Sequence, residues 1–176
     1  MGKDFVIRGL RFEDFEGVVK NYWTYYSELK KNRELGLVLF RKKPALKEEL
    51  NWFVPLYKAC LSGDAIALVA VVGKEIVGSC EVKRGRPGSD ADHIGNFGLA
   101  VRDGFRSQGI GKALLSAAID KSRGKFKKIT LVVLENNKKA IGLYKKFGFR
   151  KYGFLPDAVR RGDKKFNDVL MYLELD

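Results

Sequence analysis

The sequence predicts an α/β protein (mixed α+β) in which helices cover both faces of a mixed β-sheet. Two observations support this prediction. In the second half of the chain, strand-like apolar runs alternate with helical segments, which is typical of crossover connections and parallel strand pairing. In the first half, two apolar runs flank the turn Gly73-Lys74, which indicates an antiparallel hairpin. One sheet with both kinds of pairing follows.

The first half begins with a short apolar strand, followed by a helix whose apolar residues recur at helical spacing. A second helix lies between Pro44 near its start and Gly63 just past its end, positions that suit those residues. Pro55 inside this helix is expected to kink or divide it. The expected ranges are a strand at 5–8, helices at 11–29 and 44–61, hairpin strands at 65–72 and 75–83, and a loop at 84–90.

The second half repeats the order strand, helix, strand, helix, strand. Its first helix follows a glycine-bearing turn, and the last apolar run alternates well enough for a closing strand. The expected ranges are strands at 93–101 and 128–134, helices at 109–123 and 137–147, a strand from 149 onward and a closing strand at 166–175.

Length and composition limit the classes of function. With 176 residues, the chain is expected to form a single domain over residues 1–176. No apolar run approaches the roughly 20 residues of a membrane span, and no signal-peptide core opens the chain. Cys60 and Cys80 form no paired framework, so we expect a cytoplasmic protein. The net charge of +13 suits polyanions and a solvated surface equally, and alone it decides nothing.

The most informative stretch runs from Leu99 into a turn with Gly104, Gly109 and Gly111, and then directly into a helix. Free backbone N–H groups and the helix dipole at such a turn form an anion site that suits a diphosphate. A P-loop is excluded because Ile110 occupies the lysine position. A dinucleotide fingerprint is excluded because Leu114 stands where the third glycine would be.

Two ordered motifs carry a resemblance to a known family. The first is R-x-x-G-x-G, spelled by residues 106–111, and the second is N-x-x-A-x-x-L-Y-x-x-x-G-F, spelled by residues 137–149. Both resemble the GNAT superfamily of N-acetyltransferases, firmly from about Leu99 to Phe149 and more loosely beyond. The resemblance implies a central mixed, mostly antiparallel twisted sheet of about seven strands with helices on both faces.

The resemblance also implies acetyl-CoA as cosubstrate, no metal, and direct acetyl transfer to an amine, either a small molecule or a protein N-terminus or lysine. Asn137 and Tyr144 are two helical turns apart and share a face, so Asn137 is expected near the pantetheine arm and Tyr144 near the sulfur. The positions expected to bind the cofactor are Leu99, Ala100, Val101, Arg106, Ser107, Gln108, Gly109, Ile110, Gly111, Lys112, Asn137, Ala140 and Tyr144.

The chemistry needs a proton donor for the leaving thiolate and an acceptor for the amine proton. Tyr144 is the candidate acid. The base stays open, because Asn96 stands where many relatives have a glutamate; Glu81, His93 and solvent are the alternatives. Backbone N–H groups of residues 99–101 are expected to stabilise charge on the carbonyl oxygen. The cysteines need no role.

The acceptor is not specified by the sequence. Aromatic residues at 22–26 and 52–53 could hold a cationic amine or simply belong to the core. The basic segment 30–43 argues against a polyamine. Two other functions stay open: a coenzyme A sensor without turnover, and a nucleic-acid-binding module, which the scattered lysines disfavour. We expect no membrane partner, and a homodimer is left open.

Overall fold

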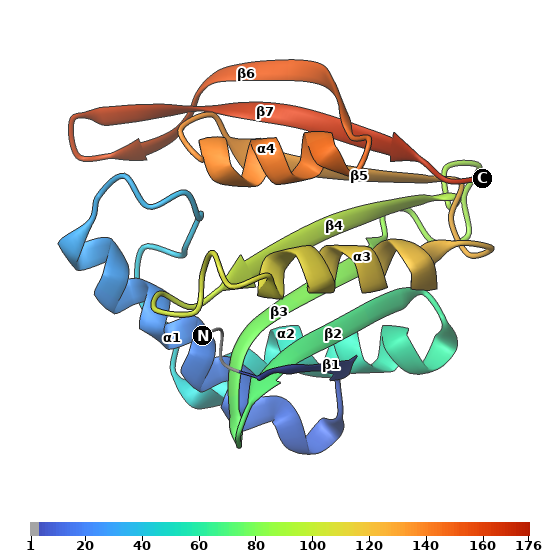
Figure 1. The fold of residues 1–176 in the computed structure, drawn as a ribbon, viewed down its shortest axis with the longest axis horizontal. Helices are drawn as coiled ribbons and strands as arrows, with labels where there is room; N and C mark the ends of the chain where they lie inside the picture. Colours follow the sequence, from blue (N-terminus) through green and yellow to red (C-terminus); the bar gives the residue numbers. More distant parts are fainter. Residues whose placement is uncertain (1–3) are drawn as a thin grey trace.

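The computed structural model describes residues 4–176, so part of the N-terminal segment on which the signal-peptide expectation rests lies outside it. The described chain forms a seven-stranded sheet in the order β1-β2-β3-β4-β5-β7-β6 (Figure 1). The strands are β1 (Val6–Gly9), β2 (Ala65–Val72), β3 (Glu75–Arg84), β4 (Ile94–Val101), β5 (Lys128–Leu134), β6 (Arg150–Arg161) and β7 (Lys164–Glu174). The helices are the short 3₁₀ turn η1 (Phe12–Asp14), α1 (Phe15–Lys31), α2 (Leu46–Ser62), α3 (Ile110–Ser122) and α4 (Lys138–Lys146).

The pairing confirms a mixed, mostly antiparallel sheet and corrects one detail of the prediction. The crossover through α3 makes β4 and β5 parallel, as expected. The crossover through α4 does not produce a parallel neighbour, because β7 lies between β5 and β6 and is antiparallel to both. The closing hairpin thus inserts its second strand beside β5, where β7 pairs along the whole of Lys128–Leu134.

The second helix shows that Pro55 does not divide it, so this part of the prediction is wrong. α2 runs unbroken over Leu46–Ser62, with Pro55 on its exposed side. The ring therefore points away from the sheet, where the lost backbone hydrogen bond can be replaced by water. Gly63 ends the helix with a φ of 85°, as its position in the sequence predicts.

Strand alternation divides the apolar core between the two faces of the sheet. Leu68 and Cys80 belong to the main core, which α3 completes with Leu114 and Leu115. Val69 on β2 points to the opposite face and packs with Val18 of α1. Helices thus cover both faces, as expected, and none of the helices among residues 4–176 is long and apolar enough to cross a membrane.

One irregularity of the sheet positions the site. β4 pairs with β5 only from Ile94 to Asn96, whereas it stays paired with β3 as far as Val101. Residues 97–101 therefore have one strand edge without a β partner, at the place where β4 and β5 separate between α3 and α4 (Figure 1). An extended ligand could form backbone hydrogen bonds along this free edge.

Candidate active site

The turn between β4 and α3 presents a row of free backbone donors. α3 begins after Gly109, whose φ is 87°, and Ser107 has a φ of 61°. None of the hydrogen bonds found over residues 4–176 uses the backbone N–H of residues 107–112. Gly109 needs its left-handed conformation to let the chain enter the helix. Free N–H groups and the positive end of a helix dipole are the features that favour a diphosphate, and diphosphate binding at this turn stays a prediction.

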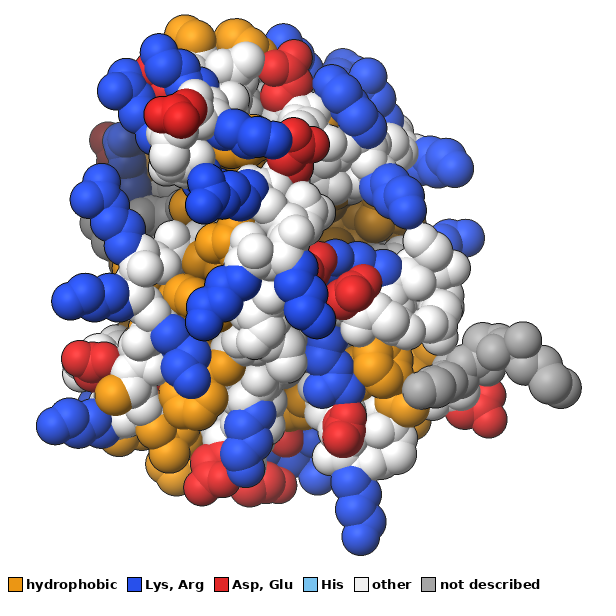
Figure 2. All heavy atoms as spheres, turned by 90° about the vertical axis from the view of Figure 1, so that its left-hand side faces the viewer, with side chains coloured by type: hydrophobic (Ala, Val, Ile, Leu, Met, Phe, Trp, Pro, Cys, Tyr) orange, Lys and Arg blue, Asp and Glu red, His pale blue; other side chains and the backbone are white. Residues whose placement is uncertain are grey.

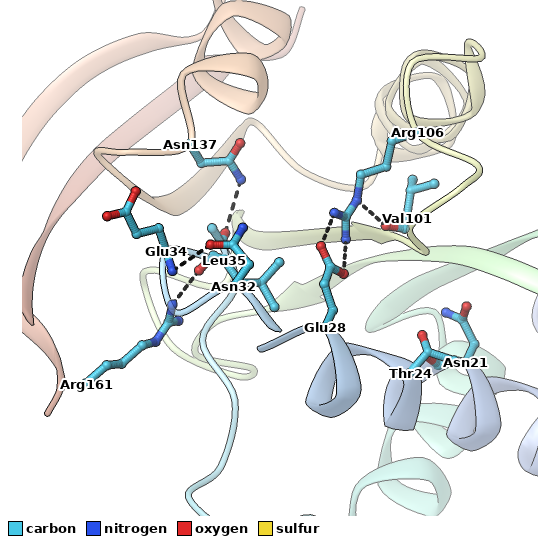
Figure 3. Close-up of polar contacts among 11 residues, drawn as sticks. Asn21, Thr24, Glu28, Asn32, Glu34, Leu35, Val101, Arg106, Asn137 and Arg161 are labelled. Carbon is cyan, nitrogen blue, oxygen red and sulfur yellow. Dashed lines mark hydrogen bonds and ion pairs between the residues drawn. The ribbon is translucent and has the colours of Figure 1, made fainter. Parts of the chain in front are cut away.

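Arg106 lies beside this turn, but its side chain has other partners. The guanidinium forms a two-pronged ion pair with Glu28 of α1, with Nη2 2.7 Å from Oε2. Its Nε donates to the carbonyl of Val101 at 2.7 Å (Figure 3). Burial alone would lower the pKa of Arg106, but the Glu28 carboxylate outweighs it and raises the pKa. Arg106 therefore ties the turn to α1 with its charge already neutralised.

Tyr144 projects from α4 toward β4. Its ring packs edge-on against Phe97, with the ring centroids 6.1 Å apart, and contacts Phe149 at 5.7 Å. Burial raises the pKa of Tyr144 to about 12, and nearby Cys80 adds to the effect. The phenol is therefore protonated at neutral pH and can act as a hydrogen-bond donor.

Asn137 begins α4 and uses its side chain locally. Its Oδ1 accepts from the N–H of Ala140 at 3.2 Å, which caps the helix. Its Nδ2 donates at 3.1 Å to the carbonyl of Gly36 in the connecting loop, residues 32–45 between α1 and α2 (Figure 3). Contact with the pantetheine arm stays a prediction for Asn137, while the structure gives it a role in holding this loop.

The two candidate bases lie in different places. Glu81 on β3 lies opposite Gly98 of β4 and lines a pocket between the helices and the sheet, paired with Lys83 at 2.8 Å. His93 is exposed just before β4, and its Nδ1 lies 3.1 Å from the carbonyl oxygen of Asp90. Six residues of strand put roughly 20 Å between His93 and Leu99. Asn96 accepts a hydrogen bond from Thr130 at 2.8 Å.

The pocket beside Glu81 has a volume of about 410 Å³ and lies between α1, α2 and strands β2–β4. Leu99 and Ala100 contribute to its floor, so it meets the predicted cofactor strand. Two of its lining residues are not among the candidates that the sequence predicts: Glu49, which is 6% exposed, and Asn21, which is 2% exposed. A signal for Glu49 existed, because Glu49, Phe53 and Leu56 recur at helical spacing on the buried face of α2.

The cysteines occupy packing positions. Burial raises the pKa of Cys80 to about 12, so it is a protonated thiol, and its Sγ donates to the carbonyl of Leu114 at 3.6 Å. Cys60 is half-buried at the end of α2. Over residues 4–176, no group of three or more His, Cys, Asp or Glu side chains is placed to hold a metal ion.

The basic residues do not form one stripe on the face that carries α1. In Figure 2, Lys and Arg side chains are spread over the whole of this face, with acidic side chains among them. Nucleic-acid recognition usually concentrates positive charge along one groove or helix. This face therefore gives no support to a nucleic-acid-binding function.

Comparisons with known proteins agree with the geometry. The acetyltransferase (GNAT) family model matches residues 20–149. A Pseudomonas aeruginosa L-methionine sulfoximine/L-methionine sulfone acetyltransferase is 26% identical over 115 residues, 65% of this chain and 67% of that protein. Among solved structures, an N-acetyltransferase from Staphylococcus aureus superposes with a TM-score of 0.82 at 19% identity, covering 98% and 99% of the two chains. The yncA protein of Salmonella typhimurium, solved with acetyl-CoA, gives 0.82 at 18% identity, covering 98% and 95%. The chain therefore belongs to the acetyltransferase (GNAT) family.

Proposed function

We propose that the protein is an N-acetyltransferase that moves the acetyl group of acetyl-CoA directly to an amine. One observation carries the proposal: the free N–H groups of residues 107–112 lie next to the unpaired edge of β4, and β4 also forms the floor of the pocket that contains Glu81. A diphosphate site, an edge for an extended arm and an acceptor pocket therefore follow one another along a single strand.

In this proposal the amides of residues 107–112 hold the diphosphate of acetyl-CoA, and Lys112 in the first turn of α3 adds positive charge. The pantetheine arm, which carries amide groups, lies along the free edge of residues 97–101. The side chain of Arg106 supports the turn from behind through Glu28, so its contribution to binding is indirect.

Acetyl-CoA supplies a thioester, and the neutral nitrogen of the acceptor attacks its carbonyl carbon. The C–N bond forms, the C–S bond breaks, and the products are an N-acetyl amide, coenzyme A thiol and one proton released from the original ammonium ion. Backbone N–H groups of residues 99–101 stabilise the negative charge that develops on the carbonyl oxygen. Glu81 accepts the amine proton directly or through water, because it faces the pocket and His93 does not.

Tyr144 is the donor to the leaving sulfur. The pKa of an ordinary thiol is about 8.5 and that of Tyr144 is about 12, so the thiolate is too weak a base to remove the proton of the phenol. Tyr144 therefore stabilises the thiolate with a hydrogen bond. The thiolate then takes up the second proton that the amine nitrogen loses as the amide forms. Such charge-assisted hydrogen bonds are roughly twice as strong as neutral ones.

Calorimetric titration of the purified protein with acetyl-CoA tests the proposal, with ATP and duplex DNA as controls at physiological salt. We expect one acetyl-CoA per chain and release of coenzyme A thiol when an amine panel is added. Stoichiometric binding without turnover of any amine would favour a coenzyme A sensor. Absence of acetyl-CoA binding together with salt-sensitive DNA binding would replace the proposal by a nucleic-acid function.

A further inference from the structure

The pocket between α1, α2 and the sheet has a size that suits a small molecule. Its volume of about 410 Å³ lies in the range of small-ligand sites. Gly98 and Ala100 of β4 form part of its floor, and Phe40 of the connecting loop forms part of its wall. Within the described part of the chain, Lys, Arg and His are absent from the lining.

Two buried oxygen atoms in this pocket have no hydrogen-bond partner. They are Oε1 of Glu49, which projects from α2, and Oδ1 of Asn21, whose Nδ2 donates to the hydroxyl of Tyr25 at 3.2 Å. Both side chains are more than nine-tenths buried. A buried acceptor without a hydrogen-bond partner is unfavourable, and more so when it is charged. Two such acceptors in one pocket indicate a ligand that brings N–H donors.

The surrounding charges leave Glu49 uncompensated. Burial raises the pKa of Glu49, the indole N–H of Trp23 opposes this shift, and the charge of Glu48 adds to it. Neither Trp23 Nε1 nor Glu49 Oε1 meets the geometry of a hydrogen bond. The Nζ of Lys43 lies 4.3 Å from a ring centroid of Trp23, and no ion pair between residues 4 and 176 includes Glu49. The other pocket carboxylate, Glu81, is paired with Lys83 at 2.8 Å.

This charge pattern separates two classes of acceptor. An ammonium ion would meet the Glu49 carboxylate and the Asn21 oxygen, with the ring of Tyr22 among the lining residues that surround them. An amino acid, the class of acceptor named for the Pseudomonas relative, would also bring its own carboxylate beside Glu49 and Glu81. Burying that carboxylate without a cation carries a large desolvation penalty.

We propose that the acceptor is a small primary amine without a carboxylate group, and that Glu49 and Asn21 receive its N–H groups. The lining residues Leu10, Val19 and Leu56 favour an apolar skeleton for this amine. The inference rests on the proposed acetyl transfer and specifies its substrate class. A nitrogen held as an ammonium ion is concentrated in the pocket but is not yet nucleophilic. Glu49 is therefore a binding residue, and its effect falls on KM more than on kcat.

Two matched pairs of compounds test the proposal: phenethylamine with L-phenylalanine, and 3-methylbutylamine with L-leucine. The members of each pair differ only by the carboxylate. We expect kcat/KM, measured by release of coenzyme A thiol, to be at least about tenfold higher for each amine than for its amino acid. The reason is that the carboxylate of the amino acid would be buried without a partner, a loss on the scale of at least one charge-assisted hydrogen bond. Equal or better use of the amino acids would overturn the proposal, and so would failure of both amines to bind in calorimetry with coenzyme A present.

Variants locate the effect. Glu49→Gln should raise the KM for phenethylamine at least about tenfold, with kcat changed less than about twofold. Asn21→Leu removes the unpaired acceptor together with the hydrogen bond to the Tyr25 hydroxyl, and it should raise KM severalfold. The control Glu16→Gln changes an exposed carboxylate on α1 that pairs with Lys20, and should leave KM unaltered. An unchanged KM in both pocket variants would refute the assignment.

The same experiments separate this inference from the proposed function. If acetyl-CoA neither binds nor reacts but phenethylamine binds in calorimetry and Glu49→Gln abolishes that binding, the transferase proposal fails and the amine pocket stands. If acetyl-CoA binds with normal stoichiometry but neither amine does, the pocket assignment fails alone. Loss of an unpaired buried carboxylate should also leave the melting temperature of Glu49→Gln equal to or above that of the parent protein.

Discussion

The two halves of the proposed site are built from different materials. The cofactor half consists of backbone: free amides at residues 107–112 and a free strand edge at residues 97–101. The acceptor half consists of side chains that come from separate elements, with Asn21 on α1, Glu49 on α2 and Glu81 on β3. Both halves share β4 as a common floor.

This difference explains which half can be recognised from sequence. A backbone site needs a fixed order of glycines and a helix start, so it leaves a short motif in consecutive residues. A side-chain pocket needs only that the fold brings a few residues together, and their spacing in the chain is arbitrary. Cofactor binding should therefore depend on backbone conformation, and acceptor choice on single side chains.

The largest effect is expected at the junction of the two halves, for Tyr144→Phe. Turnover should fall about a hundredfold, the upper scale for loss of a hydrogen bond to a charged group, while acetyl-CoA affinity changes less than about twofold. The ring contacts with Phe97 and Phe149 are retained, so stability should change little. Because the pKa of Tyr144 is about 12, no loss of activity below about pH 11 should come from its ionisation.

Steady-state kinetics and calorimetry on Tyr144→Phe check this prediction. Tyr172→Phe is the matched control, since Tyr172 packs against Tyr152 on β6 and lies outside the pocket lining. Unchanged turnover in Tyr144→Phe would remove Tyr144 from the mechanism and place the whole site on backbone and pocket residues.

Next in size is Gly109→Ala, which tests the backbone half directly. The φ of 87° would cost an alanine roughly 1–2 kcal/mol, and the new methyl group would lie beside the free amides. We expect acetyl-CoA affinity to fall about tenfold or more. Gly124→Ala is the control: Gly124 has a φ of 75° and, like Gly109, open space around its Cβ direction.

Calorimetry with acetyl-CoA and thermal unfolding of both glycine variants separate binding from strain. Both should lose similar stability, and only Gly109→Ala should lose affinity. Equal affinity in the two variants would mean that the diphosphate does not approach the backbone at Gly109.

Much of the fold was predictable because its elements are strongly periodic. The helix expected at 109–123 is found at Ile110–Ser122, and the hairpin strands at 65–72 and 75–83 are found almost unchanged. The position of β7 between β5 and β6 was not predictable from local pattern, because strand order depends on which edges pair at long range. The effect of Pro55 depended on which side of the helix it occupies.

The site shows the same division. The glycine turn and Tyr144 carry their own sequence signal, whereas three interactions depend on the tertiary fold: Arg106 with Glu28, Asn137 with Gly36, and the isolation of Glu49. The sequence predicts that Arg106 binds phosphate, because this residue is basic and adjacent to the turn. Its actual partner lies on α1, and nothing in the local sequence identifies a partner so far away.

A smaller effect is expected for Glu28→Gln, which sharpens the distinction between anchor and ligand. If Arg106 acts as an anchor, loss of its partner loosens the turn, and acetyl-CoA affinity should fall about fivefold. If Arg106 binds phosphate itself, freeing its guanidinium should leave affinity unchanged or tighter. Calorimetry with acetyl-CoA gives the sign of the change, and Glu16→Gln on the same helix controls for altered net charge.

The smallest effect is expected in the acceptor half, for Arg161→Lys. Arg161 donates to three carbonyls of the connecting loop: those of Arg33 at 3.1 Å and Leu37, and that of Leu35 at 2.5 Å, which Figure 3 shows. A lysine cannot reproduce this planar fork, so the loop that carries Phe40 into the pocket wall should shift. We expect the KM for phenethylamine to rise about threefold, since one side of the pocket loosens, with acetyl-CoA affinity unchanged.

Arg160→Lys, at the neighbouring exposed arginine that pairs with Asp157, should change neither value. A loss of acetyl-CoA affinity in Arg161→Lys would show instead that the connecting loop serves both halves, and the division between a backbone half and a side-chain half would then need to be redrawn through Asn137, which holds the same loop from α4.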